Sequence, residues 1–105
     1  MSKFGIGINT EKPKEGRIKG KQKEIAVDCW FTSKGHTIPR MFKYEDQEGM
    51  IHTVRNIRVL RQEDKNYSGI PTVEYRCMIE ENEFRKELKL IFFLEEHRWV
   101  VIWNC

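Results

Sequence analysis

The C-terminal part of the chain, residues 88–103, reads LKLIFFLEEHRWVVIW and is apolar in both phases of a strand alternation. A sheet that buries only one side alternates apolar with polar residues, so this stretch predicts a β-hairpin whose two faces are both covered. The first face collects seven side chains, namely Leu88, Leu90, Phe92, Leu94, Trp99, Val101 and Trp103. The second face collects four, namely Ile91, Phe93, Val100 and Ile102.

The pairing of this hairpin with the strand before it follows from two turns. A tight turn at Glu81 and Asn82 would place Tyr75 opposite Leu88, and a turn over residues 95–98 would return the chain along the same face. A slip of one residue would move every apolar side chain to the other face, so the agreement of the two turns favours a meander. The first turn also predicts two cross-strand ion pairs, Arg76 with Glu87 and Glu74 with Lys89.

A helix over residues 83–94 is the competing interpretation of this region. Phe84, Leu88 and Ile91 recur there at helical spacing. The predicted ion pairs favour strand, and so do the β-branched residues that follow, Val100, Val101 and Ile102.

Period-2 patterns predict three further strands, separated by polar turns. Pro39, near the start of the second of these strands, argues for a strand beginning or a sheet edge, because proline has no backbone N–H. The third strand changes phase at Arg55 and Asn56, where one extra residue, a β-bulge, would restore a continuous apolar face. The expected strands cover residues 25–31, 38–44 and 50–61, the turns cover residues 33–36 and 46–49, and a polar loop covers residues 62–69.

Together these patterns predict an all-β fold of about six antiparallel strands in a meander, forming a small barrel or a strongly twisted sheet. The length of 105 residues suits one domain. Residues 1–24 carry seven basic and three acidic side chains, whereas the other 81 residues carry twelve and thirteen. With few apolar anchors, residues 1–23 are expected to form a flexible basic leader to a single β domain over residues 24–105.

The chain contains no signature of a catalytic or cofactor-binding site. It has no nucleophile elbow, no phosphate-binding glycine loop and no HExxH motif, and its three cysteines show no CxxC spacing. No apolar run approaches the ~18 residues of a membrane span, and the N-terminus lacks the pattern of a signal peptide. We therefore expect a non-catalytic, cytoplasmic protein without a metal or cofactor.

The second face of the C-terminal hairpin is the first candidate for a binding surface. Its apolar side chains, each contributing about 1.5–3 kcal/mol when buried, are bordered by charged residues, as in a protein interface. The chain itself could cover them, through Phe4, Ile6 and Ile8 or through a loop carrying Tyr67, and so could a small molecule. Cover by the chain itself stays open, and our hypothesis is a contact with a second copy or a partner protein through Ile91, Phe93, Val100 and Ile102.

Single-stranded nucleic acid is the alternative partner. The basic leader would neutralise phosphates, and residues 38–61 add arginines beside aromatic residues, a combination by which small β-barrels hold single strands. Against this, the rest of the chain is slightly acidic, and Phe42 and Tyr44 fit core positions. The candidate contacts are Lys19, Lys21, Lys23, Arg40, Lys43, Arg55 and Arg58.

Overall fold

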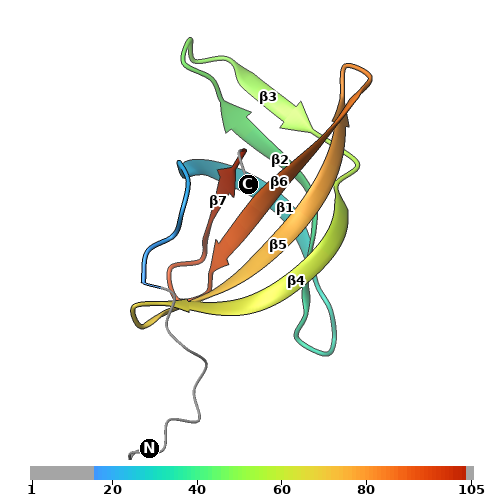
Figure 1. Cartoon of the computed structure of the whole chain (residues 1–105). Coiled ribbons are helices and arrows are strands. Elements are labelled where there is room, and N and C mark those ends of the chain that lie inside the picture. The colour runs from blue at the N-terminus through green and yellow to red at the C-terminus, as the bar shows by residue number, and fades with distance from the viewer. Residues whose placement is uncertain (1–15, 104–105) are drawn as a thin grey trace, which may run out of the picture.

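The computed structural model describes residues 16–103, which form one curved antiparallel sheet of seven strands (Figure 1). The described residues form no helix, so none of them provides a helix that could cross a membrane, and the alternative of a helix over residues 83–94 is wrong. The predicted all-β antiparallel fold is confirmed. The strands are β1 (Lys23–Phe31), β2 (Thr37–Glu45), β3 (Ile51–Val54), β4 (Arg58–Tyr67), β5 (Ile70–Glu81), β6 (Phe84–Phe93) and β7 (Arg98–Ile102).

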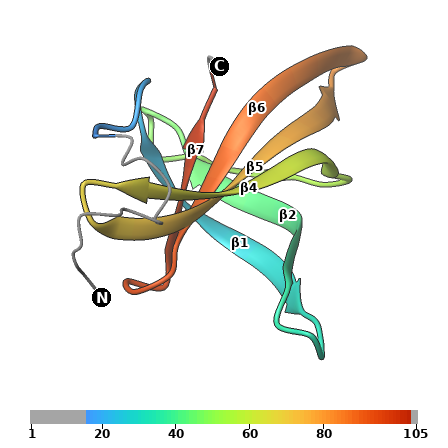
Figure 2. The same ribbon diagram turned by 60° about the horizontal axis from the view of Figure 1, so that its bottom comes forward.

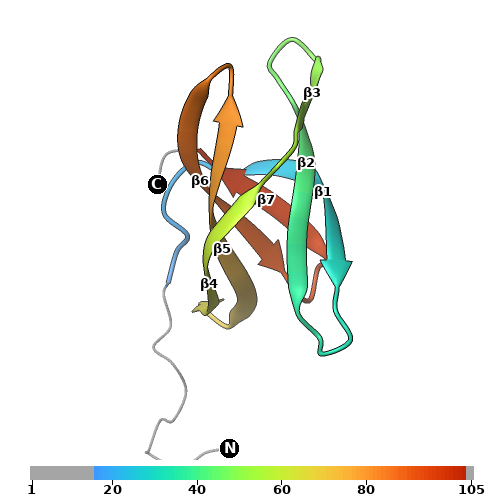
Figure 3. The same cartoon turned by 90° about the vertical axis from the view of Figure 1, so that its right-hand side faces the viewer.

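The sheet consists of two meanders that meet at β1. Across the sheet the strands lie in the order β3-β2-β1-β7-β6-β5-β4. Residues 23–25 of β1 pair with residues 99–101 of β7, whereas residues 26–31 pair with β2. The N-terminal group, β1 to β3, and the C-terminal group, β4 to β7, face each other across the interior (Figure 3). Because β3 and β4 are the edges and do not pair, the sheet is strongly twisted and open, not a closed barrel.

Side chains from both groups fill the interior between them. Five of the seven predicted first-face residues are buried there, and Trp103 is half-buried against them. Leu94 is 42% exposed, because β6 ends at Phe93 and the next residue already belongs to the turn. The buried core consists of Phe42, Val54, Tyr75, Cys77, Ile79, Leu88, Leu90, Phe92, Trp99 and Val101.

The C-terminal strands pair two residues away from the predicted register. Asn82 and Glu83 form the turn between β5 and β6, with φ of 52° and 69°, as a type I′ turn requires. Tyr75 therefore lies opposite Leu90 and not opposite Leu88. Side chains alternate with a period of two, so this slip exchanges the partners but leaves every residue on its predicted face.

The two predicted ion pairs are present as diagonal contacts. Arg76 Nη1 lies 3.3 Å from Glu87 Oε1, and Lys89 Nζ lies 3.5 Å from Glu74 Oε1. Long side chains reach diagonal neighbours in a sheet, which is why the pairs persist in the shifted register. The turn between β6 and β7 also begins one residue earlier than predicted, at Leu94.

The strand predicted over residues 50–61 is divided into two strands at opposite edges of the sheet. Residues 55–57 separate β3 from β4, and Asn56 has a φ of 58°. A complete break therefore replaces the bulge predicted at this point. The bulges of the sheet lie elsewhere, with Arg40 as the extra residue of β2 and Leu60 as the extra residue of β4.

The polar loop predicted over residues 62–69 is wrong, because β4 extends to Tyr67 and only Ser68 and Gly69 turn the chain. β4 pairs with β5 along one side only, and most of its side chains are exposed. Charged residues on an edge strand discourage pairing with other chains. The same residues remove the apolar alternation by which a strand is detected in a sequence.

Both turns predicted for the N-terminal group are confirmed. In the second, Asp46 Oδ1 accepts hydrogen bonds of 2.9 Å from the N–H groups of Glu48 and Met50, and Gly49 has a φ of 84°. His52 Nε2 lies 2.7 Å from Asp46 Oδ2. The contact with His52, together with the backbone hydrogen bonds, holds the pKa of Asp46 below its ordinary value.

Part of the predicted leader lies outside the described residues. Phe4, Ile6 and Ile8 fall in that part, as does Cys105 at the other end of the chain. The flexibility assigned to residues 1–23 stays a prediction.

We predict that Glu83→Gly stabilises the protein by about 0.5–1 kcal/mol. Glu83 has a φ of 69°, a region that costs a non-glycine residue roughly 1–2 kcal/mol, and the change creates the Asn-Gly pair favoured in type I′ turns. Glycine's greater freedom in the unfolded chain offsets part of the gain. Urea denaturation measures the effect. Glu81→Gly, within β5, should destabilise the protein, and equal effects of the two changes would contradict the turn geometry.

Candidate functional site

The second face of the C-terminal hairpin is buried within the chain. Ile91, Phe93, Val100 and Ile102 are 0–3% exposed, and Ile18 of the leader packs against them. Buried side chains offer no ready contact surface, so a partner would have to displace whatever covers them. Their role in binding stays a prediction.

The described part of the leader (blue in Figure 1) is also attached by polar contacts. Ser68 Oγ donates a hydrogen bond of 3.1 Å to the carbonyl oxygen of Gly16. Arg17 and Lys19 line a pocket of about 260 Å³ that also contains Glu74. Glu74 is 7% exposed and its Oε2 has no hydrogen-bond partner, so the nearby cations reduce the cost of burying this carboxylate.

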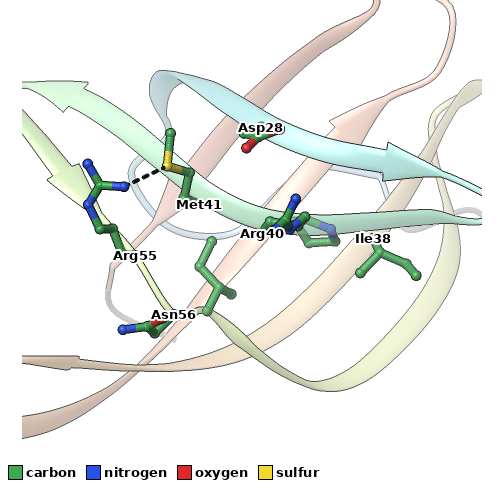
Figure 4. Close-up of a pocket in the computed structure, with 8 residues that line it drawn as sticks. Asp28, Ile38, Arg40, Met41, Arg55 and Asn56 are labelled. Atoms are coloured by element: carbon green, nitrogen blue, oxygen red, sulfur yellow. Dashed lines mark hydrogen bonds between the residues drawn. The ribbon is translucent and has the colours of Figure 1, made fainter.

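The predicted nucleic-acid contacts do not form one surface. Arg40 and Arg55 both line a cleft on the outer face of the N-terminal group (Figure 4). Lys43 and Arg58 are exposed on β2 and at the start of β4. The three leader residues line two other pockets, Lys19 beside Glu74, and Lys21 and Lys23 beside Trp103.

The arginine cleft, lined by Arg40, Arg55, Met41, Pro39 and Asp28 among others, has a volume of about 530 Å³. It lies where β2 carries its bulge and where β3 does not reach, so Pro39 stands at a local sheet edge, as predicted. Arg55 Nη1 lies 3.7 Å from Met41 Sδ (Figure 4). The cleft thus combines two guanidinium groups, one carboxylate and an apolar floor.

A second opening, which we call the β1–β7 wedge, lies on the inner face of the sheet. β1 diverges from β7 and from the turn that precedes it, as Figure 2 shows. The opening has a volume of about 630 Å³. Its lining includes Ile25, Val27, Cys29 and Phe31 from β1, Phe92 and Trp99 from the C-terminal hairpin, and His97 and Arg98 at the rim.

The wedge exists because β7 is much shorter than β1. The pairing of the two strands ends at Ile25, opposite Trp99, and the chain turns away at His97, whose φ is 52°. Within the described residues, residues 27–31 of β1 have no ladder partner on the side that faces away from β2. Alternate residues of a strand direct their N–H and C=O groups to each side, so β1 leaves backbone donors and acceptors free along the wedge.

Aromatic rings line the wall of the wedge. Phe92 stacks on Trp99 with ring centroids 4.9 Å apart, and Phe31 meets Phe92 edge-on at 6.4 Å. Phe31 is nevertheless 68% exposed. The wedge therefore places an accessible apolar wall beside a free strand edge.

The chemistry of the wedge is not that of an activated nucleophile. Burial raises the pKa of Cys29, and the charge of Asp28 raises it further, so the thiol stays protonated near neutral pH. Reactive cysteines have lowered pKa values, held down by a neighbouring cation or a helix N-terminus. Within residues 16–103, no three metal-ligating side chains come together. The groups present are suited to binding.

Sequence patterns predicted β1 and β7 but not the wedge between them. Val27, Cys29 and Phe31 share one phase of a predicted strand. Nothing in the sequence indicates which of these residues lack a neighbouring strand. The wedge arises from the unequal lengths of the two strands, nine residues for β1 against five for β7, and the sequence carries no signal of that difference.

Comparisons of the chain with protein-family models, with curated proteins and with solved structures found no match. The function must therefore be inferred from the geometry of the chain itself.

Tyr75 supports the wall of the wedge from behind. Its ring packs on Trp99 with centroids 5.5 Å apart, and its side chain is 1% exposed. The hydroxyl makes no hydrogen bond of ordinary length, although the Thr37 side chain lies near enough to oppose part of the rise in its pKa. Burial raises the pKa of Tyr75 to about 12, since the charged phenolate would lose its hydration.

We predict that Ile18→Ala destabilises the protein by about 1 kcal/mol. Ile18 is only partly buried against the second face, so the loss should fall below the roughly 2–5 kcal/mol of a fully buried isoleucine. Urea denaturation measures it, with the exposed Lys21→Ala as the control. Equal stability of the two variants would show that Ile18 contributes nothing to covering this face.

We predict that Tyr75→Phe leaves the stability at pH 7 unchanged or higher, because it removes a buried hydroxyl that makes no hydrogen bond. The folded pKa of about 12 lies above the ordinary value of 10, so the neutral phenol's contribution is complete below pH 10 and is lost as the pH rises towards 12. The variant should therefore lose less stability over that range in urea denaturation. A loss above about 1 kcal/mol at pH 7 would reveal a partner for the hydroxyl.

Proposed function

We propose that this protein is a non-catalytic binding module that holds an extended segment of a partner protein in the β1–β7 wedge by β-strand addition. The observation that carries the proposal is the free edge of β1 over residues 27–31, beside an apolar wall. Main-chain hydrogen bonds to such an edge supply affinity, and pockets for alternate side chains supply specificity.

The dimensions of the wedge favour a peptide. Five residues of strand extend over about 16 Å, a length that a short extended segment can follow and a compact small molecule cannot. The wall formed by Phe31, Phe92 and Trp99 would receive the apolar side chains on one face of the added strand. The opposite side chains would point outward, so alternating sequences fit best.

The C-terminal hairpin remains the protein-binding element in this proposal, but through its inner residues Phe92 and Trp99. The second-face residues Ile91 and Phe93 are buried, so contact through them would first require displacement of their cover. Phe92 and Trp99 are also largely buried, at 8% and 7% exposed, but they line the wedge beside Phe31, which is 68% exposed. Binding there is the simpler route to a partner.

A random nine-residue phage-display library, selected on the full-length protein, provides the test. We expect the selected peptides to alternate apolar and polar residues, and the synthetic labelled peptide to bind by fluorescence anisotropy. Phe31→Glu should weaken its binding about ten-fold, which is the effect of losing one aromatic contact. N-methylation of the peptide should abolish binding at alternate positions only, since only those N–H groups would face β1.

Phe84→Glu is the matched control, because Phe84 is also an exposed phenylalanine, 75% against 68% for Phe31, but lies at the start of β6 outside the wedge. Equal losses for the two variants, or N-methylation effects without alternation, would overturn the proposal. If the occupant is a second copy of the chain, ultracentrifugation will show a dimer that Phe31→Glu dissociates. That outcome would replace the partner protein with self-association.

A further inference from the structure

The arginine cleft on the outer face is separate from the wedge and offers different chemistry. We propose that it binds single-stranded nucleic acid, with phosphate held by Arg40 and Arg55 and a base stacked on the layer formed by Arg40 and Trp30. This inference does not depend on the proposed function. The two sites lie on opposite faces of β1.

The first observation is the state of the two arginines. Arg61, Arg76 and Arg98 each lie within ion-pair distance of a glutamate. Within residues 16–103, neither Arg40 nor Arg55 has a carboxylate at that distance. Two arginines that line one cleft and are not held in ion pairs can bind an anion there, and arginine binds phosphate with two parallel hydrogen bonds.

The second observation is an aromatic layer beside the cleft. Arg40 Cζ lies 4.6 Å from the ring centroid of Trp30, and Trp30 is 56% exposed. Ile38, opposite Trp30 across the β1–β2 ladder, is 42% exposed and also lines the cleft. Unpaired bases stack on exposed aromatic rings and on arginine planes, and each stack contributes roughly 1–3 kcal/mol.

The third observation concerns the form of the nucleic acid. Asp28 lines the same cleft, and a carboxylate there opposes the dense phosphate charge of a duplex. A single strand carries fewer phosphates per unit length than a duplex. Its unpaired bases also expose amino groups that can donate hydrogen bonds to the Asp28 carboxylate. Stacking on Trp30 also requires a base that is not held in a pair. Lys43 is exposed on the outer face of β2, as Met41 is, and extends the positive charge beyond the cleft along β2.

The proposal is tested with two fluorescein-labelled oligonucleotides, fifteen-residue oligodeoxycytidylate and oligocytidylate, and the full-length protein. Fluorescence anisotropy at low and at near-physiological salt gives the affinity and its salt dependence. We expect the double variant Arg40→Gln and Arg55→Gln to bind about ten-fold or more weakly and to reduce the salt slope by about 1.4, which corresponds to two phosphates. Trp30→Ala should also weaken binding, and Trp30→Phe should restore most of it.

Arg85→Gln is the matched control, because Arg85 is an exposed arginine at the start of β6 with no ion-pair partner among the described residues. It should leave the affinity unchanged. Equal losses in Arg85→Gln would mean charge attraction without a site. Equally tight binding of polyglutamate would make the cleft a site for acidic peptides, and the absence of binding at low salt would reject it. The substituted side chains are exposed, and thermal unfolding checks that the variants remain folded.

Discussion

The pairing of β1 with two different neighbours is the constraint on which the rest of the structure depends. Residues 23–25 hydrogen-bond to β7, and residues 26–31 continue along β2. One strand therefore joins both meanders, and the sheet must bend around it. The bend encloses the core on the inner side, and the early end of the β7 pairing leaves the wedge. If β7 were as long as β1, the wedge would be closed by a continuous ladder.

The sheet is open because its two edge strands, β3 and β4, do not pair with each other, although only a short connection joins them. Residues 55–57 carry the chain from β3 to β4, with Asn56 in a left-handed conformation, and β3 itself has only four residues. A closed barrel would need a ladder between these two edges with matched register and tilt. β4 instead remains an edge strand rich in charged residues, which is one way in which proteins limit unwanted strand pairing.

Alternation of side chains made the faces predictable from the sequence, but not the neighbours. Residues 88–93 and 99–101 lie on their predicted faces although their partners differ by two residues, because a slip of two preserves the pleat. The position of the turn determines the register. Asn82 and Glu83 both have positive φ there, and the sequence has no glycine at these positions to indicate that conformation. Residues 62–67 of β4 are predicted as loop, since an exposed edge strand needs no apolar alternation. Arg40 and Arg55, two of the predicted nucleic-acid contacts, line the arginine cleft, and their role in binding stays a prediction. The wedge depends on strand ends that the sequence does not mark.

The two neighbouring residues at the end of β1 show how one strand serves two surfaces. Phe31 lies opposite the buried Thr37 and meets Phe92 on the inner face, while Trp30 lies opposite Ile38 and beneath Arg40 on the outer face. Packing in the core does not explain why these two rings are present, because both lie at the margin of the core and are largely exposed. Their separation depends on the pleat, which sends adjacent side chains to opposite sides. The bulge places its extra residue, Arg40, in β2, so β1 carries no extra residue along the wedge.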